Sequence, residues 1–438
     1  MSARNQHRIF EPARMQESAL LSAGISPEAV SAWFQARQET RTVRASIRAR
    51  ADANFGKVMR AFRRCPLAEA ELAGSTGYGY GDLAREGLDR LTAEIFGCQQ
   101  AAVRLQWVSG THAIASALRG NLRPGQTLLA ATGAPYDTLL PVIGHPVDYP
   151  GSLASWGIGY REVPLAGETI DLAALQEAID DSTGVVFLQR SRGYTWRRSF
   201  HLDELAEAIA VVRAKAGDRV VTLVDNCYGE MVELQEPSQL GADLVVGSLI
   251  KNLGATIVPT GAYVAGTSKA VEGALTAFTA PGLSGHVGPT LGFARGMAQA
   301  LSLAPQTVAQ CLEGLVVAAW LFEHAGFDTS PRWNDRRTDT IQAVALGSVQ
   351  SQRAFCKAVQ SVGLVDARAT PTSVVQPGYR DPILMAGGTF ISGSSAELSA
   401  DGPEREPYVC YLQGGTARLH VELAALTALE VLKTSARK

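Results

Sequence analysis

Residues 221–263 read VTLVDNCYGEMVELQEPSQLGADLVVGSLIKNLGATIVPTGAY, and they contain three short apolar runs separated by turn-forming residues. The first run, VTLVD, is rich in β-branched side chains and ends on Asp225. The second, GADLVVGS, continues into SLIKN, which carries Lys251, and the third begins at TGAY. Short apolar runs of this kind are typical of strands buried in a parallel sheet. The stretch therefore predicts neighbouring strands, with Asp225 ending one and Lys251 following the next.

The pairing of Asp225 with Lys251 indicates a specific chemistry. A buried sheet has no structural use for a lone lysine at a strand end, whereas a lysine amine that condenses with an aldehyde is the nucleophile of enzymes that use pyridoxal 5'-phosphate (PLP). Such enzymes also need an acid beside the pyridinium nitrogen, and Asp225 lies 26 residues before the lysine. The alternative is that Asp225 only ends a strand and Lys251 faces solvent. We predict PLP held as a Schiff base on Lys251, with Asp225 as its catalytic partner.

A phosphate site is predicted one strand–helix unit earlier, in VSGTHAIASALRG. Ser109, Gly110 and Thr111 would place backbone N–H groups at a helix N-terminus, which suits a phosphate dianion. Ser248, three residues before Lys251, is a further candidate for this role. The alternative is that SGT is only a helix cap.

Longer motifs resemble a known family. VDNCYGE followed by GADLVVGSLIKN resembles the PLP-binding core of the cystathionine and methionine γ-lyase group. QRSRGYTWR, TAPG, FISGSSAELSADGP and PYVCYLQGG resemble its methionine γ-lyase-like or aluminium resistance protein branch, from about residue 40 to the C-terminus. The resemblance implies an α/β protein of PLP-dependent transferase fold type I. We expect an N-terminal arm and helix over 1–75, a PLP-binding large domain with a mainly parallel sheet between helices over 76–305, and a smaller α+β domain over 306–438.

The resemblance also implies further cofactor contacts. An aromatic ring stacks on the cofactor in this family, and we assign Tyr136 to that catalytic position, with His112 left open as the alternative. The family's glycine-rich loop, here GSTGYGYGD, brings a Tyr and an Arg to the phosphate of a neighbouring subunit. Tyr78 or Tyr80 and Arg85 are the candidates. The cofactor site is therefore expected near a subunit interface, in a homodimer or homotetramer.

Arginines are the candidates for binding the substrate carboxylate. Arg190 and Arg192 follow a predicted strand, where open α/β sheets bind ligands, and guanidinium forks suit a carboxylate. The resemblance adds Arg418, the counterpart of an arginine in the small domain of the γ-lyases. Gly193 and Tyr194 stand where that family has an Asn-Pro dipeptide that contacts the cofactor. This departure leaves the reaction specificity open.

The composition narrows the class of protein. The 438 residues are 46% hydrophobic and 19% charged, with a net charge of −2, so nothing indicates nucleic-acid or membrane binding. The six cysteines form no CxxC pair, and neither a disulfide framework nor a metal site is predicted. The N-terminus lacks the apolar segment of a signal peptide, and no apolar run is long enough to span a membrane. A cytoplasmic protein is expected.

Local patterns add details outside the site. Residues 1–25 are predicted to be an arm, Ser26 to cap a helix that continues to about Phe62, and Gly97 to end another helix. The C-terminal lobe is expected to run strand, helix, strand, strand, helix. Residues 390–403, FISGSSAELSADGP, are expected to form an exposed loop rich in acids and hydroxyls.

Together these observations predict an enzyme whose small-molecule substrate is an amino acid. The resemblance implies a carbon–sulfur lyase, which eliminates a β- or γ-substituent and yields a thiol, a 2-oxo acid and ammonia. The residues themselves indicate only PLP and an amino acid. An aminotransferase, an aldolase for β-hydroxy amino acids, and a non-catalytic PLP-fold protein in metal tolerance are the alternatives.

Overall fold

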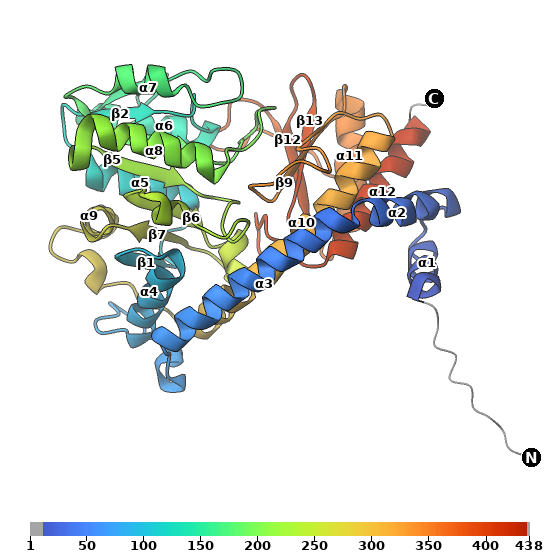
Figure 1. The fold of residues 1–438 in the computed structure, drawn as a ribbon, viewed down its shortest axis with the longest axis horizontal. Helices are drawn as coiled ribbons and strands as arrows, with labels where there is room; N and C mark the ends of the chain where they lie inside the picture. Colours follow the sequence, from blue (N-terminus) through green and yellow to red (C-terminus); the bar gives the residue numbers. More distant parts are fainter. Residues whose placement is uncertain (1–11, 436–438) are drawn as a thin grey trace, which may run out of the picture.

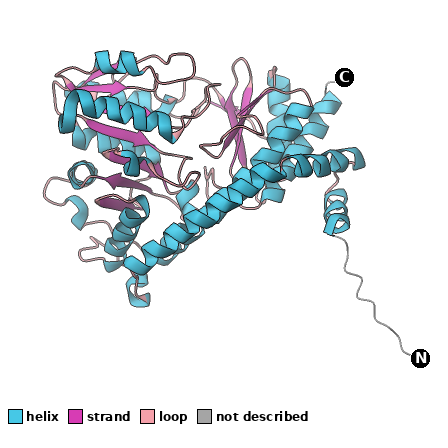
Figure 2. Ribbon diagram, viewed as in Figure 1, coloured by secondary structure: helices cyan, strands magenta, loops and turns pink. Residues whose placement is uncertain are grey.

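The computed structural model describes residues 12–435 and contains two β-sheets, each in its own lobe (Figure 1). The larger lobe is built on a seven-stranded sheet and the smaller lobe on a six-stranded sheet. Figure 2 shows the two groups of strands separated by loops, with long helices along one side. Helix α3 (Arg41–Arg64) runs diagonally past both lobes, and α10 (Ala294–His324) packs along it.

The large sheet has the strand order β1-β7-β6-β5-β4-β2-β3. Only β7 runs antiparallel to its neighbours, and the other pairs are parallel. The strands are β1 (Gln100–Arg104), β2 (Thr127–Ala130), β3 (Gly159–Glu162), β4 (Thr183–Gln189), β5 (Val221–Asp225), β6 (Leu244–Ser248) and β7 (Ala262–Gly266). The predicted fold class, α/β with a mainly parallel sheet and a smaller second lobe, is confirmed.

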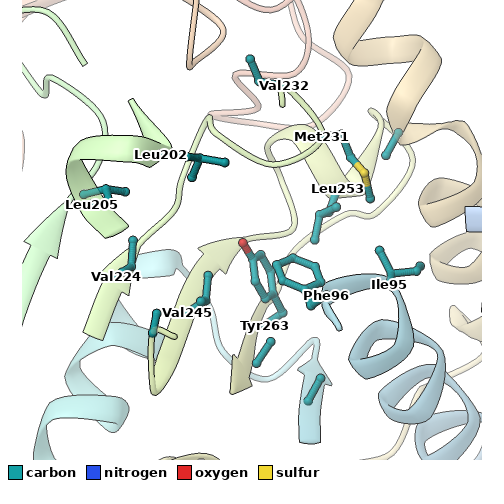
Figure 3. Close-up of a cluster of buried hydrophobic side chains, with 14 of the residues drawn as sticks. Ile95, Phe96, Leu202, Leu205, Val224, Met231, Val232, Val245, Leu253 and Tyr263 are labelled. Carbon is teal, nitrogen blue, oxygen red and sulfur yellow. The ribbon is translucent and has the colours of Figure 1, made fainter. Parts of the chain in front are cut away.

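Helices cover both faces of this sheet, which explains why its central strands are apolar throughout. Alternate residues of β4 and β5 pack into two separate clusters, one beneath α5 and α9 and the other beneath α4, α7 and α8. In the second cluster Leu205 faces Val224, and the rings of Phe96 and Tyr263 lie 5.0 Å apart (Figure 3). The helices are α4 (Leu83–Phe96), α5 (Gly110–Asn121), α6 (Leu140–Ile143), α7 (Leu172–Ala178), α8 (Leu202–Ala216) and α9 (Ser268–Phe278).

The small lobe is an antiparallel sheet backed by helices. Its strand order is β10-β11-β12-β13-β9-β8, and helices α11 and α12 pack with α10 and α2 in one apolar cluster. The strands are β8 (Thr329–Ser330), β9 (Ile341–Ala345), β10 (Ser373–Val374), β11 (Ile383–Ala386), β12 (Ser399–Pro403) and β13 (Val409–Gln413). The remaining helices are α1 (Pro12–Ser22), α2 (Pro27–Glu39), α11 (Val349–Ser361) and α12 (Arg418–Ser435).

Two local predictions are confirmed and one is wrong. The Ser26 side chain caps α2, and Gly97 ends α4 in a left-handed conformation. The predicted arm over 1–25 contains helix α1 within the described residues, and residues 1–11 lie outside them. Residues 390–403 are not an exposed loop, because β12 pairs with both β11 and β13 and buries much of the segment.

Helix α10 is long and apolar enough to cross a membrane. However, 72% of its apolar window is buried inside the protein. It contacts α3, α12 and the turn that follows Lys251, and its apolar composition is therefore explained by its position in the core. The predicted domain boundary at residue 305 falls within this helix.

Candidate active site

A cavity of about 260 Å³ lies at the carboxyl ends of β5 and β6, where the two lobes meet. Ligands bind at such edges of open α/β sheets. Both lobes contribute to its lining. The large lobe supplies Ser109, Gly110, Thr111, Tyr136, Asp137, Thr138, Gln189, Ser191, Gly193, Tyr194, Asp225, Cys227, Tyr228, Ser248, Ile250 and Lys251, and the small lobe supplies Ile341, Tyr379, Asp401, Tyr411 and Gln413.

Lys251 follows β6 directly and projects into this cavity, which we call the lysine cavity. Its Nζ donates a hydrogen bond to Ser395 Oγ at 3.2 Å and lies 3.7 Å from the centre of the Tyr228 ring. Burial alone would lower the pKa of Lys251, but Tyr228, Cys227 and Asp225 raise it above its usual value. Tyr228 adopts a φ of 72°, a strained conformation for a non-glycine residue of the kind that gathers at functional sites.

Asp225 is the last residue of β5 and is 3% exposed. Its Oδ1 accepts a hydrogen bond from the Cys227 backbone N–H at 3.1 Å. Burial raises the pKa of Asp225, while the Cys227 hydrogen bonds and the charge of Lys251 oppose that rise. A cationic ring nitrogen beside this carboxylate would further favour its ionised form. The residue pair predicted from two strand ends therefore lines one cavity.

The N-terminus of α5 forms the polar end of the cavity. Ser109 caps the helix by accepting a hydrogen bond from the His112 N–H at 3.1 Å, and the first helical N–H groups lie beside it. A Cβ at Gly110 would lie 3.4 Å from both Cys227 Sγ and the Cβ of Ser248, so glycine leaves this end open. The backbone N–H groups of this helix terminus and the hydroxyls of Ser109, Thr111 and Ser248 fit a phosphate group.

The two aromatic candidates are placed differently. Tyr136 lines the cavity, and its hydroxyl is 3.0 Å from Thr111 Oγ1. Burial raises the pKa of Tyr136 well above its usual value, which keeps the phenol protonated. His112 does not line the cavity, because its ring packs against Phe278 on the other side of α5.

No arginine lines the lysine cavity among residues 12–435. Arg190 is fully buried behind it, where it donates to Asn226 Oδ1 at 2.7 Å and forms an ion pair with Glu233 at 2.8 Å. Arg192 lines a different cavity, whereas its two neighbours, Ser191 and Gly193, line the lysine cavity. Arg418 begins α12 and is likewise outside. The structure thus does not bring the predicted carboxylate-binding arginines to the lysine.

An acid from the small lobe occupies this region instead. Asp401 on β12 is 8% exposed and accepts a hydrogen bond from Gln413 Nε2 at 2.8 Å. Burial raises its pKa to about 6, and Lys251 opposes that rise. Sequence reasoning missed Asp401, Gln413 and Ser395, because their segments are close to the lysine only through the pairing of β12 with β13. The resemblance of FISGSSAELSADGP to a family motif was the available signal.

The glycine-rich loop lies away from the lysine cavity of its own chain. Tyr78 and Tyr80 are 74% and 63% exposed, and their rings lie 5.5 Å apart on the surface. Arg85 is buried in α4 and donates to the backbone oxygen of Gly79 at 2.6 Å. None of these three residues lines the cavity.

Comparison with known proteins identifies a matching family and a similar sequence. The sequence model of the methionine gamma-lyase family matches residues 30–433. An uncharacterized protein of Bacillus subtilis, YnbB, is 43% identical over 381 residues, which cover 86% of this chain and 90% of that protein.

Solved structures of similar proteins have the same architecture. A candidate cystathionine beta-lyase involved in aluminum resistance from Clostridium acetobutylicum aligns with a TM-score of 0.91 and 39% identity, covering 95% of this chain and 98% of that one. A carbon-sulfur lyase involved in aluminum resistance from Clostridium novyi aligns with a TM-score of 0.90 and 38% identity, covering 94% and 98%. The pyridoxal-5'-phosphate dependent protein YhfS of Escherichia coli, at 19% identity and a TM-score of 0.59, shares the fold.

Proposed function

Because the chain belongs to the methionine gamma-lyase family, we propose that it is a PLP-dependent carbon–sulfur lyase. Its substrate would be a sulfur-containing amino acid, and the reaction a β-elimination. One proton leaves Cα, the thiolate leaves Cβ, and water then replaces the amino group. The products are a thiol, a 2-oxo acid and ammonia. A cytoplasmic location remains a prediction.

The observation that carries this proposal is the shared cavity. Lys251, Asp225, Tyr136 and the N-terminus of α5 all line it. When bound, PLP supplies an electron sink for negative charge at the substrate Cα. Lys251 would hold the cofactor through its aldehyde, Asp225 would pair with its ring nitrogen, and Ser109–Thr111 with Ser248 would bind its phosphate.

The side chains around the cavity would perform the proton transfers. The freed amine of Lys251 would accept the Cα proton, since it is the basic nitrogen in the lining. Tyr136 would stack on the cofactor ring, and its protonated hydroxyl is available to donate a proton to the departing sulfur. Tyr228 and Ser395 contact the Lys251 amine, and they would position it when it accepts the Cα proton.

We further propose that Asp401 determines which thioether is accepted. A buried carboxylate in a cavity lined by no arginine favours a substrate with a second ammonium group at its distal end. Cystathionine has such a group, whereas the methylthio end of S-methyl-L-cysteine, which also carries its sulfur on Cβ, is neutral. The name of the Clostridium acetobutylicum protein agrees with a β-lyase of this kind, and that of the Clostridium novyi protein agrees with a carbon–sulfur lyase.

The first experiment is to record the visible spectrum of the purified protein and then to assay thiol and 2-oxo acid release. A Schiff base on Lys251 is expected to absorb at roughly 420 nm, and Lys251→Ala should lose this band. L-Cystathionine should release both products, S-methyl-L-cysteine should be a poorer substrate, and L-methionine, whose sulfur is on Cγ, should release no thiol by β-elimination. Asp401→Asn should lower kcat/KM for cystathionine and leave the value for S-methyl-L-cysteine nearly unchanged.

Other outcomes would redirect or end the proposal. A spectral shift with amino acids but without elimination products would indicate transamination or aldol cleavage. A colourless protein that PLP cannot reconstitute would overturn the assignment of the cofactor.

We also propose a homodimer or larger assembly with the cavity near its interface. The 74–82 and 279–293 loops lie against each other, since the Gly288 N–H donates to the Tyr78 oxygen at 3.0 Å. Together with Leu83 at the start of α4, they expose large apolar side chains: Tyr78, Tyr80, Leu83, Leu283, Leu291 and Phe293. Val108, next to the phosphate end of the cavity, is also 73% exposed. Clustered apolar exposure of this kind marks interaction surfaces.

Light scattering should give at least a dimer mass, and a monomer would contradict the proposal.

A further inference from the structure

A second cavity, of about 290 Å³, lies on the opposite side of residues 190–199 from the lysine cavity. We call it the arginine cavity. It lies between the lobes and has an unusual number of charged side chains. Its lining consists of Glu168, Arg192, Arg198, Ser199, His201, Ser330, Pro331, Asp335, Arg336, Arg337, Thr338 and Asp339.

Arg192 contributes a guanidinium from the large lobe. The residue is 1% exposed, and its Nε and Nη1 have no hydrogen-bond partner within the described chain. Burial lowers the pKa of Arg192, and Asp339 only partly opposes this effect. A buried arginine whose N–H groups face a cavity without partners is rare, because its desolvation is not offset by protein contacts.

Arg337 contributes a second guanidinium from the small lobe. It is 3% exposed, and its Nη2 donates to Gln342 Oε1 and the Leu315 carbonyl oxygen. Its Nε and Nη1 have no partner within residues 12–435. Burial, with a smaller contribution from the charge of Arg192, lowers the pKa of Arg337 to about 10. Two buried cations thus line the same cavity.

The other charged groups do not neutralise this pair. Arg198 is occupied by Glu204, with two bonds of 2.7 Å, and Arg336 is paired with Glu233 and Asp203. The buried acid of the cavity is Asp339, which also accepts hydrogen bonds from Ser199 Oγ and the Ile341 N–H.

The cavity lining also includes two exposed acids and a histidine. Glu168 and Asp335 are exposed, where water screens their charge, and the Nδ1 of His201 is buried without a partner. The buried part of the cavity therefore holds two guanidinium groups against one carboxylate.

We propose that the arginine cavity binds a small oxyanion that bridges Arg192 of the large lobe and Arg337 of the small lobe. Guanidinium forks bind carboxylate and phosphate oxygens in pairs, and four unpartnered N–H-bearing nitrogens are available here. The volume suits phosphate, sulfate or a small dicarboxylate. The shared chemistry is a multiply charged group with at least two acceptor oxygens.

The location of the cavity gives this anion an effector role. Ser191, Gly193 and Tyr194 line the lysine cavity, while Arg192 between them lines the arginine cavity. An anion that fixes Arg192 therefore also fixes the loop that borders the lysine. Because it bridges the lobes, the anion favours the arrangement of the two lobes described above. This inference is independent of the reaction proposed above.

The test is calorimetric titration of the PLP-saturated protein with phosphate, sulfate and succinate at constant ionic strength, with chloride as the reference. Saturation with PLP keeps the probe away from Ser109–Thr111. We expect saturable binding and a melting temperature that rises with anion concentration. Preference for phosphate and sulfate would identify a tetrahedral anion, and preference for succinate a dicarboxylate.

Matched variants make the test specific. Arg192→Met should weaken binding by about tenfold or more, since it removes charged hydrogen bonds. Without anions it should be at least as stable as the unmodified protein, because the unpaired buried charge is gone. Arg332→Gln removes an exposed guanidinium that is near in sequence but outside the cavity, and it should bind normally. Asp339→Asn should bind more tightly, which gives a reading even if Arg192→Met fails to fold.

Three results would overturn the inference. One is the absence of saturable binding at millimolar anion in the unmodified protein. Another is equal binding by Arg192→Met and Arg332→Gln, which would place the anion elsewhere. The third is unchanged or weaker binding by Asp339→Asn.

Discussion

Asp225 and Asp401 are both buried acids near Lys251, but their surroundings assign them different roles. The Asp225 carboxylate accepts a hydrogen bond from the Cys227 N–H, and its position at the end of β5 is fixed by the sheet. Asp401 lies on the facing lobe with Gln413 as its donor. Asp225 is held by a backbone N–H at a strand end, so it can pair with an atom of the cofactor whose position is fixed. Asp401 lies on the other lobe, so it can contact the distal part of a substrate that binds after the cofactor.

The role of Asp225 can be tested by Asp225→Asn. The amide oxygen can still accept the Cys227 N–H, so the fold should be kept while the charge beside the ring nitrogen is lost. We expect kcat to fall by about 10²-fold or more, the size of effect seen when a preorganised electrostatic contact is removed. The melting temperature should be unchanged or higher, because burial of the charge is unfavourable. Steady-state kinetics with a parallel melting curve checks this, and full activity would rule out the assigned role.

The raised pKa of Asp401 predicts a pH dependence of stability. The folded-state pKa is about 6, whereas an unfolded Asp titrates near about 3.9. The folded protein therefore binds more protons between these values, and the free energy of unfolding falls as pH rises through about 4 to 6. Asp401→Asn should abolish this fall. In urea denaturation the variant should be more stable at pH 7.5 by about 2–3 kcal/mol at most, and equal near pH 4. A constant difference across this range would contradict the burial argument.

Helix α5 shows how one element serves both stability and binding. Its N-cap, Ser109, uses its side-chain oxygen for the His112 N–H and also borders the lysine cavity. Helix α11 has the same kind of cap, since Ser348 Oγ accepts a hydrogen bond from the Ser351 N–H at 3.1 Å. Ser348 does not line the lysine cavity. Substitutions at the two caps can therefore be compared to separate the effect on helix stability from the effect on cofactor binding.

Ser109→Ala and Ser348→Ala should destabilise the protein by a similar amount, about 1 kcal/mol each. Only Ser109→Ala should also weaken PLP binding, because it removes a hydroxyl from the phosphate end of the cavity. Urea denaturation of the apo protein and fluorescence titration with PLP measure the two effects separately. Equal PLP affinity in both variants would remove Ser109 from the phosphate site.

Strand β12 shows where local pattern fails. Its sequence, SADGP, contains Gly and Pro and has none of the β-branched or aromatic residues that favour strands. It is a strand because β11 and β13 lie on either side and pair with it. Tertiary pairing overrides propensity here, and it carries Asp401 to the lysine.

At the scale of the whole molecule, α3 and α10 connect the two lobes. Glu313 of α10 is fully buried and is paired with Arg48 and with Arg44, the latter at 3.7 Å. Arg44 is itself 6% exposed, so it has little access to water. The Glu313–Arg44 ion pair therefore joins α10 to α3, the two helices that connect the lobes.

Glu313→Ala should destabilise the protein by about 3–5 kcal/mol, because it leaves buried Arg44 without this partner. Glu28→Ala is the matched control, since Glu28 is 87% exposed and its pairing with Lys433 at 3.4 Å is solvent-screened. That change should cost less than about 1 kcal/mol. Urea denaturation of both variants checks the difference, and similar losses would show that burial of the ion pair is unimportant.

The sequence by itself determined the strands β5 and β6 and the position of Asp225 and Lys251 at their ends, while the fold class was implied by the family resemblance of its motifs. These features depend on short apolar runs and on the rule that parallel strands end at one edge, and both are local in the chain. Only the tertiary structure decided which cavity each arginine faces. Residues 190–199 form no regular element, so no period in the sequence fixes the direction of their side chains. Tertiary structure also brought Ser395, Asp401 and Gln413 to the lysine, because contacts between residues about 150 apart in the chain arise from lobe packing and strand pairing.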